Sequence, residues 1–260
     1  MELPEISRAN VLGVGISAVN LPEAVGLFRQ ALETGVRGYV CVTGVHGVME
    51  ARRDPCLRRI LNSSLLSTPD GMPMVWVGRL QRLRRMERVF GPDLMRAVCQ
   101  MSVPNGYTHF LYGGKPGVAE HLRAVLGQQF PGLRVVGAYT PPFGPLGKNE
   151  EQELRSIVAR VKPDIFWVGL STPKQERFMA HCTKVLEARL MVGVGAAFDY
   201  LCGNIKDAPD WMKVSGLQWL HRFAQEPGRL WKRYLVNNPR FLWDITLQVM
   251  GIRTYPLHRG

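Results

Sequence analysis

The chain lacks any apolar run of the roughly 20 residues that a membrane-spanning helix requires. Its first residues, Met1 to Asn10, mix acidic, basic and proline residues, so they lack the charged-then-apolar order of a signal peptide. We therefore expect a cytoplasmic protein that does not cross the membrane.

Cysteine is sparse and unpaired in the sequence. The five cysteines are odd in number, lie in apolar surroundings and form no C-x-x-C pair. This pattern favours neither a zinc site nor a disulfide framework, and it is typical of a reducing compartment.

Common cofactor and metal motifs are missing as well. The GVG segment at 13–15 lacks the third glycine and the downstream acid of a dinucleotide fingerprint, and YGGKPG at 112–117 is not a Walker A loop. No histidine pair has the H-x-x-x-H spacing of a metal site, and no Asp-x-Asp pair is present. We therefore expect neither a metal nor a cofactor.

Positive charge is what the chain has in excess. The formal net charge of +12 includes five arginines between residues 79 and 88, and nine Lys or Arg against four Asp or Glu from residue 206 onward. Such an excess favours an anionic partner, which can be nucleic acid, a lipid surface or a phosphorylated substrate. Solvated arginines on a helix face would account equally well for the first stretch alone.

Short apolar segments alternate with helical patterns along residues 1–205. Strands are expected at 10–17, 38–49 with a break at Thr43-Gly44, 109–114, 133–146, 163–170 and 190–203. Helices are expected at 21–34 and 149–160. The alternation predicts an α/β fold, a Rossmann-like layered domain whose mostly parallel sheet is covered on both faces.

Residues 206–260 differ in character from the rest of the chain. Four of the six tryptophans lie there, among basic residues at helical spacing. We expect a helical, basic and aromatic appendage to the α/β domain at 1–205. At this point the appendage could be an ordinary packed helix pair, an interfacial element on anionic lipid or a nucleic-acid surface, although no known nucleic-acid-binding motif accompanies the charge.

Ligands of open α/β sheets bind beyond the carboxyl ends of the strands. The residues expected there are Thr43, His46, Asp70, Gly113, Gly114, Asp199 and the segment 171–176. Gly113-Gly114 suits either a phosphate held by backbone N–H groups or a plain turn.

Two of these segments admit both a structural and a chemical interpretation. Asp70, within STPDGMPMVW, is either a turn residue or a reactive carboxylate held on a tight turn. The segment LSTPKQERF predicts a helix start in which a residue of 171–172 caps and one of 175–176 completes a capping box. The same helix start, with Lys174 and Gln175, suits the phosphates or the base of a nucleotide.

Several longer segments occur together and in a fixed order. They are TPDGMPMVW, RVFGPDLM, FLYGG, PDIFWVGLSTPKQERF and GVGAAFDYLCGNIKDAPDWMKVSGLQWLHRFAQEPGRLWKRYLVNNPRFL. In this combination the chain, from about Asn10 to Leu242, resembles the WecG/TagA/CpsF family of bacterial glycosyltransferases (glycosyltransferase family 26). Members of that family transfer a sugar from a UDP-sugar to a lipid-linked pyrophosphoryl sugar at the cytoplasmic membrane face, with inversion and without a metal ion.

The resemblance implies roles for individual residues. Asp70 matches the proposed catalytic base, and Thr43 matches a polar residue near the reaction centre. Gln175 matches a donor contact, and we assign donor binding also to Lys174, Thr172, Gly113, Gly114 and Asp199. The arginines carried over as facing the pyrophosphate are Arg222, Arg229 and Arg233.

One departure from the family pattern concerns His46. Many relatives have an asparagine shortly after the strand-end threonine, where this chain has TGVHGVM. We place His46 among the residues that face the acceptor and its pyrophosphate, and the identity of the sugar stays open.

The sequence thus predicts an inverting, metal-independent transferase of a hexosyl or N-acetylhexosaminyl unit (mannosamine-type or glucosyl). The donor would be a UDP-sugar, and the acceptor a polyprenyl-pyrophosphate-linked sugar of cell-surface polysaccharide synthesis. We expect peripheral contact with anionic lipid at the inner face of the plasma membrane and no nucleic-acid partner, and we leave a homo-oligomer open. The alternative is a non-catalytic scaffold that binds anionic lipid through its basic C-terminal helices.

Overall fold

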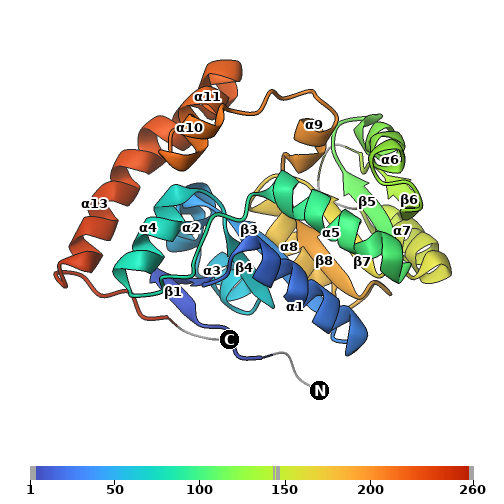
Figure 1. Ribbon diagram of the computed structural model, residues 1–260, viewed down its shortest axis with the longest axis horizontal. Helices are drawn as coiled ribbons and strands as arrows, with labels where there is room; N and C mark the ends of the chain where they lie inside the picture. The colour runs from blue at the N-terminus through green and yellow to red at the C-terminus, as the bar shows by residue number, and fades with distance from the viewer. Residues whose placement is uncertain (1–3, 143, 145–146, 258–260) are drawn as a thin grey trace.

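A six-stranded, entirely parallel sheet forms the centre of the molecule (Figure 1). The computed structural model describes residues 4–142, 144 and 147–257. The strand order is β4-β3-β8-β7-β5-β6. The strands are β3 (Gly38–Thr43), β4 (Leu66–Pro69), β5 (Thr108–Gly113), β6 (Arg134–Tyr139), β7 (Ile165–Gly169) and β8 (Leu190–Gly193). The predicted α/β class is confirmed, and positions 143, 145 and 146 of the strand-and-loop segment predicted at 133–146 lie outside the described residues.

Helices cover both faces of this sheet and enclose two apolar cores. One face carries α1 (Leu21–Glu33), α5 (Gly91–Asn105), α6 (Val118–Gln129) and α9 (Ala197–Leu201). The other face carries α2 (Val45–Arg53), α3 (Pro55–Asn62), α7 (Lys148–Val161) and α8 (Lys174–Cys182). Because both faces are buried, the central strands β7 and β8 are continuous apolar runs, whereas β4 at the edge has the sequence LSTP.

The expected first strand at 10–17 is wrong in one respect. The chain forms an antiparallel hairpin there, β1 (Arg8–Val11) and β2 (Val14–Ser17), which is separate from the main sheet. Leu12 and Gly13 both have positive φ, 53° and 86°, which is the geometry of a two-residue hairpin turn. The apolar residues of the hairpin are buried, so the hydrophobic pattern alone did not reveal the turn.

The segment after β4 is a helix. It is α4 (Met72–Leu80), which begins two residues beyond Asp70. Asp70 and Gly71 therefore form the whole connection between β4 and α4, at the carboxyl end of a strand.

The chain after α9 is helical, as predicted for residues 206–260, of which 258–260 lie outside the described residues. The elements are α10 (Asp210–Val214), α11 (Gln218–Gln225), α12 (Pro227–Trp231), the π-helical turn η1 (Lys232–Val236) and α13 (Asn237–Val249). An extended segment joins them to α9 along one edge of the molecule, and they lie together on one side (Figure 1). Phe241 and Ile245 of α13 are buried in the same core as α2 and α3.

The remainder of the C-terminal segment is anchored by hydrogen bonds. Gln248 accepts from the Leu12 N–H and donates to the Asn10 carbonyl, so α13 is joined to the first hairpin. The boundary at 205/206 stays a prediction. Within the part of the chain that the structure describes, no helix is both long enough and apolar enough to cross a bilayer.

Candidate active site

Thr43 and Asp70 lie at the carboxyl ends of two adjacent parallel strands, β3 and β4. The Asp70 N–H donates to the Thr43 carbonyl at 3.0 Å, and the Ser67 hydroxyl donates to Thr43 Oγ1 at 2.8 Å. Thr43 and Ser67 are buried, whereas Asp70 keeps part of its surface exposed. The two predicted catalytic residues are therefore direct neighbours.

Gly44 allows this close approach. A Cβ atom at position 44 would lie 2.8 Å from the Asp70 carbonyl oxygen and 3.5 Å from its Oδ2. Any larger side chain would displace the Asp70 turn, so a glycine after the strand-end threonine is a steric requirement here.

The carboxylate of Asp70 is poised to exchange a proton near neutral pH. Burial raises the pKa of Asp70 to about 6, against the opposing effects of the Arg88 and Arg233 guanidinium groups. Asp93 adds to the increase. A carboxylate with this pKa is mostly ionised at pH 7 and yet basic enough to accept a proton.

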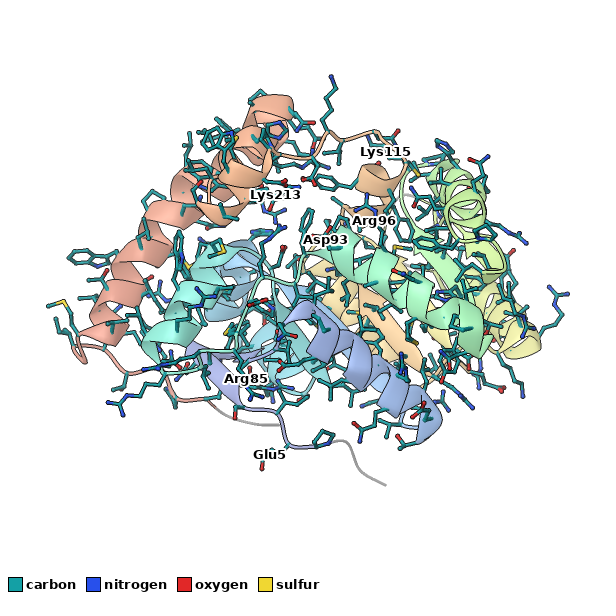
Figure 2. All side chains as sticks on the ribbon, in the orientation of Figure 1. Glu5, Arg85, Asp93, Arg96, Lys115 and Lys213 are labelled. Atoms are coloured by element: carbon teal, nitrogen blue, oxygen red, sulfur yellow. The ribbon has the colours of Figure 1, made fainter. Side chains whose placement is uncertain are left out.

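Arg88 is a site residue that the sequence did not single out. Its guanidinium group forms an ion pair with Asp93 at 3.3 Å and donates to Gln218 of α11 at 2.8 Å. The group also stacks over the Phe90 ring at 4.8 Å. Asp93 lies at the start of α5 (labelled in Figure 2). In the sequence Arg88 belongs to a stretch of five arginines and begins the segment RVFGPDLM, but no role was assigned to it.

The side chains of Thr172, after β7, and of Gln175 and Glu176, in the first turn of α8, are joined by hydrogen bonds, and the last two are buried. Glu176 Oε1 accepts from the Thr172 hydroxyl at 2.8 Å and from Gln175 Nε2 at 3.0 Å. Gln175 Oε1 accepts from the Gly195 N–H at 3.0 Å. Gln175 is only 2% exposed. Its amide connects the segments that follow β7 and β8, and one amide N–H is left for a further contact.

The capping box expected in this segment is absent. α8 begins at Lys174 without a side-chain cap, and the Thr172 hydroxyl donates to Glu176 rather than accepting from the backbone. Burial raises the pKa of Glu176, and its Oε2 has no partner among the residues described. Sequence reasoning considered Glu176 only as a cap, and nothing in the sequence distinguished its burial.

The other predicted donor residues lie in separate settings. Gly113 and Gly114 end β5, where the Gly114 N–H donates to the Gly169 carbonyl at 3.0 Å. Asp199 lies on α9, and its carboxylate accepts a hydrogen bond from the Asn204 side chain at 3.2 Å. Lys174 is exposed at the first residue of α8. The structure thus gives Gly114 and Asp199 local structural partners, and their assignment to donor binding stays a prediction.

The three predicted pyrophosphate arginines occupy different settings. Arg222 is buried, forms an ion pair with Glu226, and has an Nη1 without a partner in the described chain. Arg229 is exposed and pairs with the same Glu226 at 2.6 Å. Arg233 is exposed and pairs with no described carboxylate, although its charge acts on Asp70.

Tyr200 and Tyr234 contact two of these arginines and sense the charge of Asp70. Burial raises the pKa of both phenols, and both groups sense the charges of Asp70 and Arg222. Arg222 stacks over the Tyr200 ring at 5.7 Å, and Arg233 stacks over the Tyr234 ring at 5.7 Å. Tyr200 belongs to α9, whereas the C-terminal helices contribute the Tyr234 phenol and cations to the surroundings of Asp70.

His46 lies on the first turn of α2, close to Thr43. Asn237 Nδ2 lies 3.3 Å from His46 Nδ1. Burial, together with the charge of Arg233, lowers the pKa of His46 to about 4. Its assignment to acceptor binding remains a prediction.

No group of three or more His, Cys, Asp or Glu residues that could hold a metal ion occurs in the described ranges. The arrangement offers instead a carboxylate of raised pKa beside a buried hydroxyl, surrounded by guanidinium groups. Such a set can remove a proton from an alcohol and stabilise a departing anionic group.

Comparisons with known proteins cover most of the chain. Residues 9–254 match the family model described as "Glycosyl transferase WecG/TagA/CpsF family". A Bacillus subtilis (strain 168) protein, N-acetylglucosaminyldiphosphoundecaprenol N-acetyl-beta-D-mannosaminyltransferase, is 30% identical over 196 residues, which are 75% of this chain and 74% of that protein. The family match spans every predicted site residue.

Proposed function

Since the chain belongs to the WecG/TagA/CpsF family of glycosyltransferases, we propose that it transfers an N-acetylmannosaminyl unit from a UDP-sugar to a polyprenyl-pyrophosphate-linked N-acetylhexosamine. The choice of sugar and acceptor follows the name of the B. subtilis relative. The observation that carries the chemistry is Asp70, whose pKa of about 6 and neighbouring arginines suit proton transfer beside a departing diphosphate.

The proposed reaction is a single displacement. Asp70 removes the proton from the acceptor hydroxyl as its oxygen bonds to the anomeric carbon, while the bond from that carbon to the UDP oxygen breaks. Attack opposite the leaving group inverts the anomeric configuration. We assign to Thr43, whose Oγ1 accepts from the Ser67 hydroxyl, a hydrogen bond to a sugar hydroxyl near Asp70.

Guanidinium groups take the place of a metal ion in this proposal. The departing diphosphate gains negative charge, which preorganised cations stabilise. Arg222, with its buried unpartnered Nη1, and Arg233, without a carboxylate partner in the described chain, are the two groups with capacity for a phosphate. Arg229 forms an ion pair with Glu226, the same carboxylate that pairs with Arg222, and helps to hold it in place.

A transfer assay with purified protein tests this proposal. UDP-N-acetylmannosamine and a short-chain polyprenyl-pyrophosphate N-acetylglucosamine are expected to give a disaccharide lipid with inverted anomeric configuration, both with and without a chelator. Loss of activity on chelation that added Mg²⁺ restores would overturn metal independence. Preferential transfer of glucose would overturn the proposed N-acetylmannosaminyl donor but not the proposed glycosyl transfer. If no UDP-sugar supports transfer, the scaffold alternative is favoured.

We also propose that the C-terminal helices bind the inner face of the plasma membrane. Large apolar side chains are exposed on them, and they are Trp211, Val214, Leu220, Trp231, Leu235, Val236, Leu242, Trp243, Val249 and Met250. Exposed lysines and arginines accompany them, for example Lys232 and Arg240. Aromatic and cationic side chains together favour an anionic lipid interface.

Replacing Trp211, Trp231 and Trp243 by serine is expected to lower binding to anionic vesicles at least about tenfold, because each indole otherwise buries apolar area in the interface. The three indoles are 63%, 46% and 66% exposed, so their loss leaves the core intact. Vesicle flotation measures the binding, and activity on a water-soluble short-chain acceptor is the control. Unchanged flotation would contradict the membrane assignment.

A further inference from the structure

His46 connects three segments that are far apart in the sequence. It lies on α2, it meets Asn237 where η1 passes into α13, and it faces the Thr172 carbonyl in the turn after β7. Asn237 is only 4% exposed, so its side-chain contacts are shielded from water. Nδ1 of His46 therefore faces Asn237, and the ring also meets the Thr172 backbone.

The partners of Asn237 determine which way its amide points. Arg53 Nη2 lies 2.8 Å from Asn237 Oδ1, and a guanidinium group can only donate. The oxygen of the amide therefore faces Arg53, and its NH₂ group faces His46 Nδ1 at 3.3 Å. Consequently, Nδ1 must accept a hydrogen bond and carries no proton.

The other side of the ring leads to the same tautomer. The Thr172 carbonyl can only accept, and Nδ1 already faces the Asn237 NH₂ group, so Nε2 is the nitrogen left to donate a hydrogen to it. A neutral imidazole has one donor and one acceptor nitrogen, and this environment supplies one partner for each. Thr172 in turn donates its hydroxyl to Glu176 at 2.8 Å.

We propose that His46 is a positioning residue which, as the neutral Nε2–H imidazole, joins the C-terminal helices to the Thr172 turn. This role is an alternative to the substrate contact expected from the sequence. Arg233 lies in η1, four residues before Asn237, so the same connection places the Arg233 guanidinium beside Asp70. The inference rests on the proposed function only for its activity readout.

Protonation of His46 would break this connection. A second proton on Nδ1 would point at the Asn237 NH₂ group. The charged groups facing the ring are Arg53 on α2, Arg233 on η1 and Glu50, whose Oε1 lies 3.9 Å from Nδ1. Of these three charged groups, only Glu50 favours the protonated His46 ring. The His46 pKa of about 4 keeps the ring neutral from pH 6 to pH 8. The C-terminal helices are thus held in the range where Asp70 is ionised.

Nitrogen-15 NMR of the His46 ring gives the direct test, and it needs no substrate. We expect the Nε2–H tautomer, with an unprotonated Nδ1, throughout pH 6–8. In Asn237→Asp the new carboxylate is expected to draw a proton onto Nδ1 and raise the His46 pKa. An Nδ1–H tautomer, or titration near pH 6.5 in the unaltered protein, would overturn the proposal.

Two substitutions at position 46 separate positioning from bulk packing. His46→Gln retains one acceptor and one donor, whereas His46→Phe retains only the ring volume. In His46→Phe we expect amide exchange in 232–249 to accelerate about tenfold, as loss of roughly two hydrogen bonds implies. kcat/KM for the lipid acceptor should fall by a similar factor, and His46→Gln should recover most of both losses.

His181→Phe is the matched control, because this histidine is exposed on α8 and contacts only Glu151 at 3.1 Å among the described side chains. It should leave both measurements unchanged. Equal losses in His46→Gln and His46→Phe would overturn the proposal. Loss of kcat/KM with unchanged amide exchange would do so too, because it would assign His46 to substrate contact.

Discussion

Asp70→Asn is expected to lower kcat about 10²- to 10⁴-fold, the usual range for loss of a general base, and at the same time to stabilise the fold at pH 8. An amide has nearly the shape of the carboxylate, but it cannot accept the proton of the acceptor hydroxyl. The activity of the unaltered enzyme should rise with pH, with kcat/KM half-maximal near the Asp70 pKa of about 6.

The stability change follows from the direction of the pKa shift. Burial raises the Asp70 pKa from 3.8 to about 6, so between these pH values the folded chain binds more protons than the unfolded chain. The free energy of unfolding therefore falls as pH rises through this window, by about 2–3 kcal/mol in total, and the loss is nearly complete at about pH 7. An asparagine side chain does not titrate, so the variant avoids that loss.

Denaturant unfolding at pH 3.5 and at pH 8 measures this difference. Asp70→Asn should match the unaltered protein at pH 3.5 and exceed it at pH 8. Asp210→Asn is the matched control, because that carboxylate is 95% exposed and lies at the start of α10. Retention of turnover in Asp70→Asn within tenfold, with folding intact, would remove Asp70 from the role of base.

The layered fold could be predicted from the sequence because the patterns that indicate it are local. Parallel strands buried on both faces are apolar throughout, and β3, β5 and β7 lie where their apolar runs predict them. The hairpin at β1 and β2 was missed because its turn at Leu12-Gly13 is itself buried and apolar. Here burial concealed the turn, since turn prediction relies on polarity.

The candidate site could be predicted from the sequence only in part, for a related reason. Thr43 ends the apolar strand β3, which predicts its place at the edge of a parallel sheet, whereas Asp70 follows β4, a short strand of sequence LSTP that was not expected. Arg222 and Glu226 are four residues apart, so their pairing is a local feature, whereas the burial of Arg222 and the position of Arg88 against α11 depend on how the C-terminal helices pack. No local pattern encodes that packing, so the sequence could indicate phosphate-binding arginines but not which of them has a free donor.

Asp244, a buried carboxylate on α13, holds this helix against α2. It is 3% exposed and forms an ion pair with Arg52 of α2. Arg253 Nη1 lies 3.7 Å from its Oδ1, and Arg240 Nε lies 4.0 Å from its Oδ2. Three cations converge on one carboxylate, so its removal leaves Arg52, at 17% exposed, without a counter-charge in a poorly hydrated place.

Asp244→Ala is therefore expected to destabilise the packing of α13 by about 3–5 kcal/mol, the cost of removing one partner from a buried ion pair. Hydrogen exchange should accelerate in 237–249, while β3 and β8 stay protected. Arg240→Ala is the control, because this exposed partner at 4.0 Å should contribute less than about 1 kcal/mol. Equal effects of the two substitutions would contradict the buried pair. If α13 loosens, Arg233 should lose its place near Asp70, and turnover should fall although no group that touches the substrate has changed.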